Sequence, residues 1–147
     1  FIGQKYYPSK TDRWVCEPDY TVFQALRVWL ADYFSGRDPI SELRLDPQGT
    51  AFQRAVWDIL LRIPYGQITT YGQIAKELAV GRGLSFMSAQ AVGGAVGHNP
   101  ISILIPCHRV VGSNGNLTGY AGGLEKKEAL LQLEHVDLIK VGLAKLG

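Results

Sequence analysis

The stretch TYGQIAKELAVGRGLSFMSAQAVGGAVGHNP, residues 70–100, decides the fold of this chain. Thr70 and Gln73 form a capping-box pattern, in which each side chain satisfies a backbone donor that the helix start leaves unpaired, so a helix is expected over residues 70–79. A second helix is expected over residues 88–96, after a turn that contains glycine. Two short helices joined by such a turn describe a helix-turn-helix.

The second of these helices has an unusual composition, because Gly93 and Gly94 lie in its interior. A glycine in a helix interior costs about 1 kcal/mol relative to alanine. Side chains this small also contribute little packing energy. Either the helix packs tightly against another helix or a partner molecule approaches its backbone closely, and the sequence leaves both explanations open.

Two more helices are predicted upstream. Apolar side chains recur at spacings of three and four over residues 21–35, which is typical of an amphipathic helix. Another capping box, formed by Thr50 and Gln53, opens a helix that Pro64 ends. The segment between the two helices, residues 36–49, contains two prolines and two glycines and is expected to be a linker.

Four further segments are predicted from composition and periodicity. Residues 1–7 and 101–105 have the apolar, aromatic or β-branched composition of short strands. Residues 112–123 are rich in glycine and are expected to form a loop that brings backbone groups close to a ligand. An amphipathic helix is expected over residues 124–134, with four leucines available to the core: Leu124, Leu130, Leu131 and Leu133.

Bulk composition limits the class of protein. Of the 147 residues, 46% are hydrophobic and 19% are charged, which is typical of a globular chain. The net charge is +2, and residues 51–147 carry nine Lys and Arg against six Asp and Glu, a mild excess that is compatible with a nucleic-acid partner. No apolar run approaches the roughly 18 residues that span a bilayer, so we expect no membrane partner.

The chain has two cysteines, Cys16 and Cys107. A zinc site requires about four suitably spaced ligands, so two cysteines and three scattered histidines predict no metal. Cys16 has no reactive surroundings and is interpreted as a small apolar residue.

Cys107 has a more reactive setting. His108 and Arg109 follow it directly and favour the thiolate, the reactive form of cysteine, and Glu134 is available to orient the imidazole. Because adjacent side chains diverge, we expect His108 to reach Cys107 through a water molecule. The alternative, an inert buried thiol behind an apolar run, stays open at this point.

The heptad Ile105-Pro106-Cys107-His108-Arg109-Val110-Val111 resembles the active-site signature of the methylated-DNA–protein-cysteine methyltransferases, also called 6-O-alkylguanine-DNA alkyltransferases. The resemblance extends over residues 50–135. It implies an α+β fold with two parts: a small N-terminal RNase H-like lobe, partial here, which with the linker occupies residues 1–49, and a mainly helical C-terminal domain with a winged helix-turn-helix over residues 50–147.

The resemblance also implies a single-turnover reaction without a cofactor. The protein binds double-stranded DNA, flips out the alkylated guanine, and moves the alkyl group irreversibly from the O6 atom of guanine, or from O4 of thymine, to Cys107. Flipping is required because a stacked base hides the atom to be attacked. By similarity, His108 relays the thiol proton through water and Glu134 orients His108. Asn99 bridges the recognition helix to the active-site segment, and Tyr71 crowds the neighbouring phosphate and assists base rotation.

The same resemblance indicates which residues face DNA. The glycine- and alanine-rich helix over residues 88–96 is expected to bind in the minor groove of DNA, because small side chains permit close approach to the groove. Family members often have an arginine where this chain has Gln90. Because glutamine lacks the charge and the stacking plane of guanidinium, we expect Gln90 to stabilise the space left by the flipped base less well. The predicted DNA- and base-binding residues are Gln90, Ala89, Ala91, Gly93, Gly94, Tyr120, Ala121 and Arg109. We expect a cytoplasmic, bacterial-type monomer that associates with the nucleoid when it is on DNA.

Three other functions compete with this one. A non-catalytic alkyl-lesion sensor has the same architecture, but it typically carries Trp where this chain has Cys107. A cysteine hydrolase needs an oxyanion hole and a base in direct contact with the thiol, which adjacent Cys and His make awkward. A plain helix-turn-helix regulator would leave the Pro-Cys-His-Arg segment without a purpose.

Overall fold

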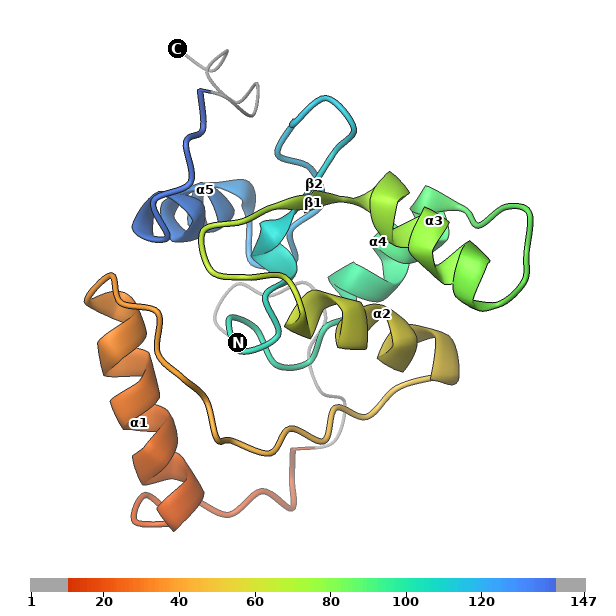
Figure 1. Ribbon diagram of the computed structural model, residues 1–147. Coiled ribbons are helices and arrows are strands. Elements are labelled where there is room, and N and C mark those ends of the chain that lie inside the picture. The colour runs from red at the N-terminus through yellow and green to blue at the C-terminus, as the bar shows by residue number, and fades with distance from the viewer. Residues whose placement is uncertain (1–10, 140–147) are drawn as a thin grey trace. The chain divides into compact units, whose positions relative to one another are not determined.

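The computed structural model describes residues 11–139, so the strand predicted over residues 1–7 lies outside it. Within the described range the chain forms two compact units, residues 11–46 and 47–139. The first unit contains one helix, α1, and the second contains all the other elements (Figure 1). Among residues 11–139, no helix is both long and apolar enough to cross a membrane.

The helix α1 (Thr21–Phe34) confirms the helix predicted over residues 21–35. The rings of Trp29 and Tyr33, one turn apart, stack with 5.3 Å between their centroids. Residues 37–46 have no regular structure, as expected for a linker. Cys16 is exposed, which does not suit its interpretation as a small apolar residue.

Three helices that pack on one another organise the second unit: α2 (Ala51–Leu61), α3 (Tyr71–Gly81) and α4 (Ala89–Gly97). Both predicted capping boxes are present. The Thr50 hydroxyl accepts from the Gln53 backbone at 3.1 Å while Gln53 Oε1 accepts from the Thr50 backbone at 2.9 Å. Thr70 and Gln73 make the same two bonds at 3.1 and 2.9 Å. The starts of α2 and α3 are therefore fixed by local sequence.

Trp57, which no sequence pattern singled out, lies buried between α2 and α4. It is 1% exposed, and its indole N–H donates to the Ala95 carbonyl at 2.9 Å, so α2 and α4 are hydrogen-bonded as well as packed. Gly49 is required beside it, because a Cβ at that position would lie 2.5 Å from the indole ring. The buried apolar faces of α2 and α3 include Val56, Ile59, Leu60, Ile74, Ala75 and Leu78.

The strand predicted over residues 101–105 is wrong. These residues form a turn in which the Ile105 N–H donates to the Ile101 carbonyl at 3.0 Å, and Ile103 adopts a positive φ of 74°. The small parallel sheet is formed instead by β1 (Thr69–Thr70) and β2 (Val110–Val111). Between the turn and β2 lies η1 (Cys107–Arg109), a short 3₁₀ helix.

The last helix, α5 (Leu124–Leu133), begins after Gly123, whose φ is 97°. In Figure 1, η1 lies between α5 and the group formed by α2, α3 and α4, so both sides of this short segment are covered. Leu130 and Leu131 are buried as predicted. Leu124 is 46% exposed, so its predicted place in the core is wrong.

Candidate active site

Cys107 opens η1 and is 5% exposed. Its Sγ accepts a hydrogen bond from the side-chain amide of Asn99 at 3.1 Å. Burial raises the pKa of the Cys107 thiol, while the Asn99 hydrogen bond and the charge of Lys127 act in the opposite direction. The thiol is therefore shielded from water but surrounded by groups that favour its anion.

Asn99 joins the end of α4 to the active-site turn. Its Nδ2 also donates to the Ile105 carbonyl at 2.7 Å, and its Oδ1 accepts from the Ile101 N–H at 3.0 Å. An aspartate could not donate the two bonds that Nδ2 makes, to Cys107 Sγ and to the Ile105 carbonyl. The amide thus supplies the backbone partners that a strand neighbour would otherwise provide, and it fixes Cys107 relative to α4.

His108 and Glu134 form a fully buried pair, with 2.6 Å between Nε2 and Oε1. Burial lowers the pKa of His108, although the hydrogen bond and the charge of Glu134 oppose this effect. The imidazole is thus neutral and donates Nε2–H to the carboxylate, so its Nδ1 is the acceptor. The structure brings together the predicted residues Cys107, His108, Glu134 and Asn99.

Arg109 makes a forked contact with the same carboxylate. Its Nε lies 2.8 Å from Oε2 of Glu134 and its Nη2 lies 3.0 Å from Oε1, while Nη1 donates to the Ile63 carbonyl at 2.6 Å. The Arg109 side chain is only 11% exposed. The predicted contact between Arg109 and DNA stays a prediction, and the observed contacts give the residue a different task, the neutralisation of Glu134.

Tyr71, the first residue of α3, reaches across to the glycine-rich loop. Its hydroxyl lies 2.9 Å from the Thr118 carbonyl and 3.2 Å from that of Gly119. Gly119 has a φ of 63°, and a Cβ there would lie 3.2 Å from the Tyr71 hydroxyl, so the loop needs glycine at this point. Burial raises the pKa of Tyr71 to about 12, so the phenol stays protonated at neutral pH.

Tyr120 lies farther along this loop, where it interacts electrostatically with Cys107. Burial raises the pKa of Tyr120, and the charge of Cys107 adds to the shift. Its ring packs against the backbone at Gly122, where a Cβ would lie 2.8 Å from a ring carbon. Ala121 lies between them and is partly buried.

Lys127 of α5 is a functional candidate that sequence reasoning missed. Its side chain is completely buried, its Nζ donates to the Thr118 carbonyl at 2.8 Å, and it lies 5.9 Å from the centre of the Tyr71 ring. Burial lowers its pKa to about 8. A signal was present, because Lys127 shares a helical face with Leu130, Leu131 and Glu134.

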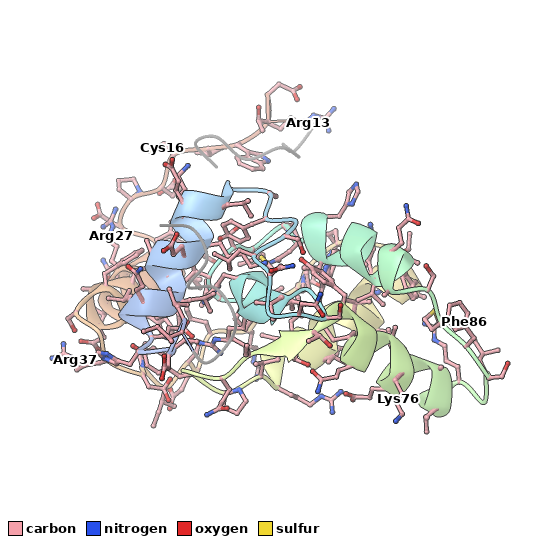
Figure 2. The ribbon with its side chains drawn as sticks, turned by 90° about the horizontal axis from the view of Figure 1, so that it is seen from above. Arg13, Cys16, Arg27, Arg37, Lys76 and Phe86 are labelled. Carbon is pink, nitrogen blue, oxygen red and sulfur yellow. The ribbon has the colours of Figure 1, made fainter. Side chains whose placement is uncertain are left out.

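Most of the predicted DNA-facing residues of α4 are exposed, unlike the residues of this buried cluster. Ala89, Gln90, Ala91 and Gly94 are exposed, and Gly93 is half-buried with the Tyr71 ring beside it. A Cβ at Gly94 would meet nothing within 4 Å, and one at Gly93 would make only an ordinary contact of 3.8 Å. Tight packing within the described residues therefore does not explain the two glycines. Figure 2 shows α3 and α4 side by side, with Lys76 on the outer side of α3 and Phe86 on the loop between the two helices.

Chemically, the arrangement combines a shielded thiol with a neutral base whose orientation a carboxylate fixes. Residues 11–139 contain no group of three or more His, Cys, Asp or Glu side chains placed to hold a metal ion. The chemistry that these side chains support is proton transfer and nucleophilic attack by sulfur.

Known proteins match this chain along most of its length. Residues 51–136 match the family model described as the DNA binding domain of 6-O-methylguanine DNA methyltransferase. The methylated-DNA–protein-cysteine methyltransferase of Haemophilus influenzae is 43% identical over 143 residues, which are 97% of this chain and 76% of that protein. The protein of the same name from Mycobacterium bovis is 47% identical over 133 residues, which are 90% of this chain and 76% of that protein.

A solved structure agrees with these matches. The crystal structure of Mycobacterium tuberculosis OGT in complex with DNA superimposes with a TM-score of 0.81 at 41% sequence identity. The match covers 95% of this chain and 82% of the other.

Proposed function

The chain belongs to the family of the methylated-DNA–protein-cysteine methyltransferases, and on that premise we propose that it repairs DNA by taking an alkyl group from the O6 atom of guanine onto its own Cys107. The observation that carries the proposal is the position of this thiol. The thiol is buried and accepts a hydrogen bond from Asn99. It directly precedes His108, whose Nε2 is hydrogen-bonded to Glu134.

The first step is removal of the thiol proton. Since Nε2 of His108 is engaged by Glu134, the proton travels from Sγ to Nδ1 through a water molecule. The imidazolium that results is stabilised by the buried carboxylate of Glu134. Arg109 donates to both oxygens of this carboxylate and holds it in place, so Arg109 is a positioning residue.

The second step is an in-line displacement. The sulfur attacks the alkyl carbon from the side opposite O6, the S–C bond forms as the C–O6 bond breaks, and the electron pair of the broken bond stays on guanine. A proton then restores neutral guanine. This proton comes from solvent, and Tyr71, whose phenol remains protonated at neutral pH, is suited to donate a hydrogen bond to the departing O6 atom. The thioether on Cys107 is stable, so each molecule reacts once. The same displacement fits O4 of thymine.

The lesion reaches the thiol by leaving the DNA stack. We assign α3 and α4 as a helix-turn-helix whose smooth outer face, formed by Ala89, Gln90, Ala91 and Gly94, lies in the minor groove. Gln90 fills the space left by the flipped base, and Tyr120 and Ala121 border the base in its pocket. A repair protein must accept any sequence, so contacts to backbone and shape suit it better than base readout.

The finer architecture belongs to the same proposal. Residues 1–49 are the latter part of an RNase H-like lobe with its linker, and residues 50–147 form the alkyltransferase domain with a winged helix-turn-helix.

The proposal is tested by the intact mass of the protein after incubation with a short duplex that contains one 6-O-methylguanine. We expect a gain of one methyl group per protein molecule, located on the peptide that contains Cys107 and absent in Cys107→Ser. If the mass is unchanged while binding is tight and selective for the lesion, the protein is a sensor and the proposed transfer is wrong.

A further inference from the structure

Glu134 lies where a carboxylate is poorly placed, directly after the last residue of α5. The C-terminal end of a helix carries a partial negative charge, which destabilises an anion beside it. Glu134 is also only 1% exposed, so water does not offset this effect. Its bond to His108, at 2.6 Å, therefore depends on contacts that hold Glu134 from outside α5.

The backbone at this end of α5 forms a Schellman motif that its sequence does not favour. The His135 N–H donates to the Gln132 carbonyl and the Val136 N–H to the Leu131 carbonyl, each at 3.0 Å. The motif prefers glycine at the position of His135, whose φ is 59°. A histidine with this backbone angle makes the end of the helix less stable than a glycine would.

Tyr65 supports this end of α5 from the turn between α2 and β1. The two backbone bonds of the motif supply no donor for the Leu133 carbonyl. That carbonyl accepts from the Tyr65 hydroxyl at 3.0 Å, across 68 residues of sequence. The hydroxyl thus acts as a helix cap from a distant segment, on the residue directly before Glu134.

The same turn also contacts the Glu134 side chain. The Gly66 N–H donates to Oε2 of Glu134 at 3.3 Å. Gly66 has a φ of 72°, and a Cβ there would lie 3.0 Å from the Glu134 carbonyl oxygen, so the turn approaches the end of α5 closely. Arg109, which donates to both oxygens of the carboxylate, also donates to the Ile63 carbonyl just before the turn.

The Tyr65 ring and hydroxyl have separate partners. The guanidinium carbon of Arg109 lies 5.8 Å from the centre of the ring, within the range of a cation–π contact. The ring therefore contacts the cation that binds Glu134, while the hydroxyl holds the backbone that carries Glu134. Phenylalanine at position 65 would keep the first contact and remove only the second.

We propose that Tyr65 is a positioning residue for alkyl transfer, whose hydroxyl caps α5 and thereby directs the Glu134 carboxylate at His108. The inference rests on the proposed function in one respect, that the His108–Glu134 pair takes up the proton of Cys107. Without the cap, the end of α5 moves and the carboxylate no longer holds Nε2 at 2.6 Å. Because this bond raises the pKa of His108, the imidazole then becomes a weaker base.

The first test is the tautomer of His108, measured from the ring nitrogen chemical shifts of protein labelled with ¹⁵N-histidine. The bond to Glu134 fixes the proton on Nε2, so the wild-type protein should show one tautomer at neutral pH. Tyr65→Phe should show a mixture of both tautomers. Tyr20→Phe, the same change at an exposed tyrosine of the first unit, should match wild type. A single wild-type tautomer in Tyr65→Phe would overturn the inference.

The second test is single-turnover methyl transfer from a duplex with one 6-O-methylguanine, in Tyr65→Phe, in Glu134→Gln and in the double variant. Tyr65→Phe alone should slow transfer about threefold to tenfold, the effect of one hydrogen bond. In the Glu134→Gln background the same change should have no further effect, because Tyr65 acts through the carboxylate. Equal slowing in both backgrounds would mean a purely structural role for Tyr65 and would overturn the inference.

The two tests also separate this inference from the proposed function, since the nitrogen shifts require neither DNA nor a lesion. A changed tautomer in Tyr65→Phe, beside a wild-type protein that transfers no methyl group, would count against the proposed function alone. An unchanged tautomer, beside a wild-type protein that repairs DNA, would count against this inference alone. A Tyr65→Phe protein that does not fold would overturn the inference as well, because the loss of one helix cap should leave the rest of the unit intact.

Discussion

The surroundings of Cys107 and the outer face of α4 differ in nearly every physical property. Around the thiol, polar and charged side chains are buried and each makes hydrogen bonds within the protein: Asn99, His108, Lys127 and Glu134 are at most 2% exposed. On α4, the outward positions are occupied by Ala, Gly and one Gln, all exposed. One region consists of polar groups held in fixed geometry, and the other consists of backbone left accessible.

The difference shows how two tasks place different demands on one small chain. Nucleophilic chemistry requires side chains whose protonation and direction are set in advance, which burial and hydrogen bonds achieve. Close approach to a duplex of any sequence requires small side chains or glycine on the contacting face, even though glycine in a helix lowers stability. Substitutions in the two regions should therefore fail in different ways.

The largest effect is expected from Glu134→Gln in the buried region. The amide cannot stabilise an imidazolium as the carboxylate does, so single-turnover methyl transfer should slow by about 10²–10⁴-fold. The change also leaves the Arg109 guanidinium without its carboxylate, which should cost about 3–5 kcal/mol in the free energy of unfolding. Rapid-quench kinetics and urea unfolding measure the two effects. Glu128→Gln, within α5, is the matched control, and equal losses in both variants would show that Glu134 has no special role.

Lys127→Met should have the opposite effect on stability. Burial lowers the pKa of Lys127 to about 8 from 10.5, so between these values the unfolded state binds the proton that the folded state has lost. The wild-type protein therefore gains stability as pH rises from 8 to 10.5, and the full cost of the buried charge is present below pH 8. We expect the variant to be more stable than wild type by about 2–3 kcal/mol at pH 7, with the difference shrinking toward pH 10.5. Urea unfolding at both pH values checks this, and a gain that does not vary with pH would contradict it.

A smaller effect is expected from Gly94→Leu on the exposed region. A side chain at this position meets nothing within the protein, and leucine favours helix more than glycine does, so the fold should be as stable as wild type or more so. The added side chain should hold the duplex away from α4 and weaken DNA binding about tenfold, or about 1.4 kcal/mol. Fluorescence anisotropy with labelled duplex measures it. Gly81→Leu, where a Cβ also meets open space, is the control, and unchanged affinity in Gly94→Leu would remove α4 from the interface.

The smallest effect is expected from Gln90→Arg. The guanidinium adds a charge and a flat surface that can stack in the space left by the flipped base. Transfer from duplex DNA should become faster by a factor of about three, a gain of about 0.7 kcal/mol. Stopped-flow kinetics on a duplex with one 6-O-methylguanine would detect the change. A rate equal to that of wild type would mean that Gln90 already fills the gap as well as arginine does.

Local sequence was sufficient where the determining contacts are local. Each capping box, the one at Thr50 and the one at Thr70, is formed within four consecutive residues, and both helix starts were predicted correctly. The turn over residues 101–105 could not be predicted, since a short apolar run does not distinguish a strand from a buried turn. What decides it is Asn99, whose side chain supplies the hydrogen bonds that a neighbouring strand would have given.

The candidate site was predictable to a similar degree. Cys107, His108, Glu134 and Asn99 could be named from motif and spacing, and the structure brings them together. The tasks of Arg109 and Lys127 depend on which way each side chain turns after folding. A lysine and an arginine normally remain in solvent, so only the packing of α5 against η1 shows that both point inward.

The separation of the two regions is tested most directly by single-turnover methyl transfer from two substrates, 6-O-methylguanine within a duplex and the same compound as a free base. We predict that Glu134→Gln slows both reactions by the same factor, and that Gly94→Leu slows only the reaction with duplex DNA. If Gly94→Leu slowed transfer from the free base as much as transfer from the duplex, the face of α4 would be part of the chemical site, and the division between a buried reacting region and an exposed binding region would be wrong.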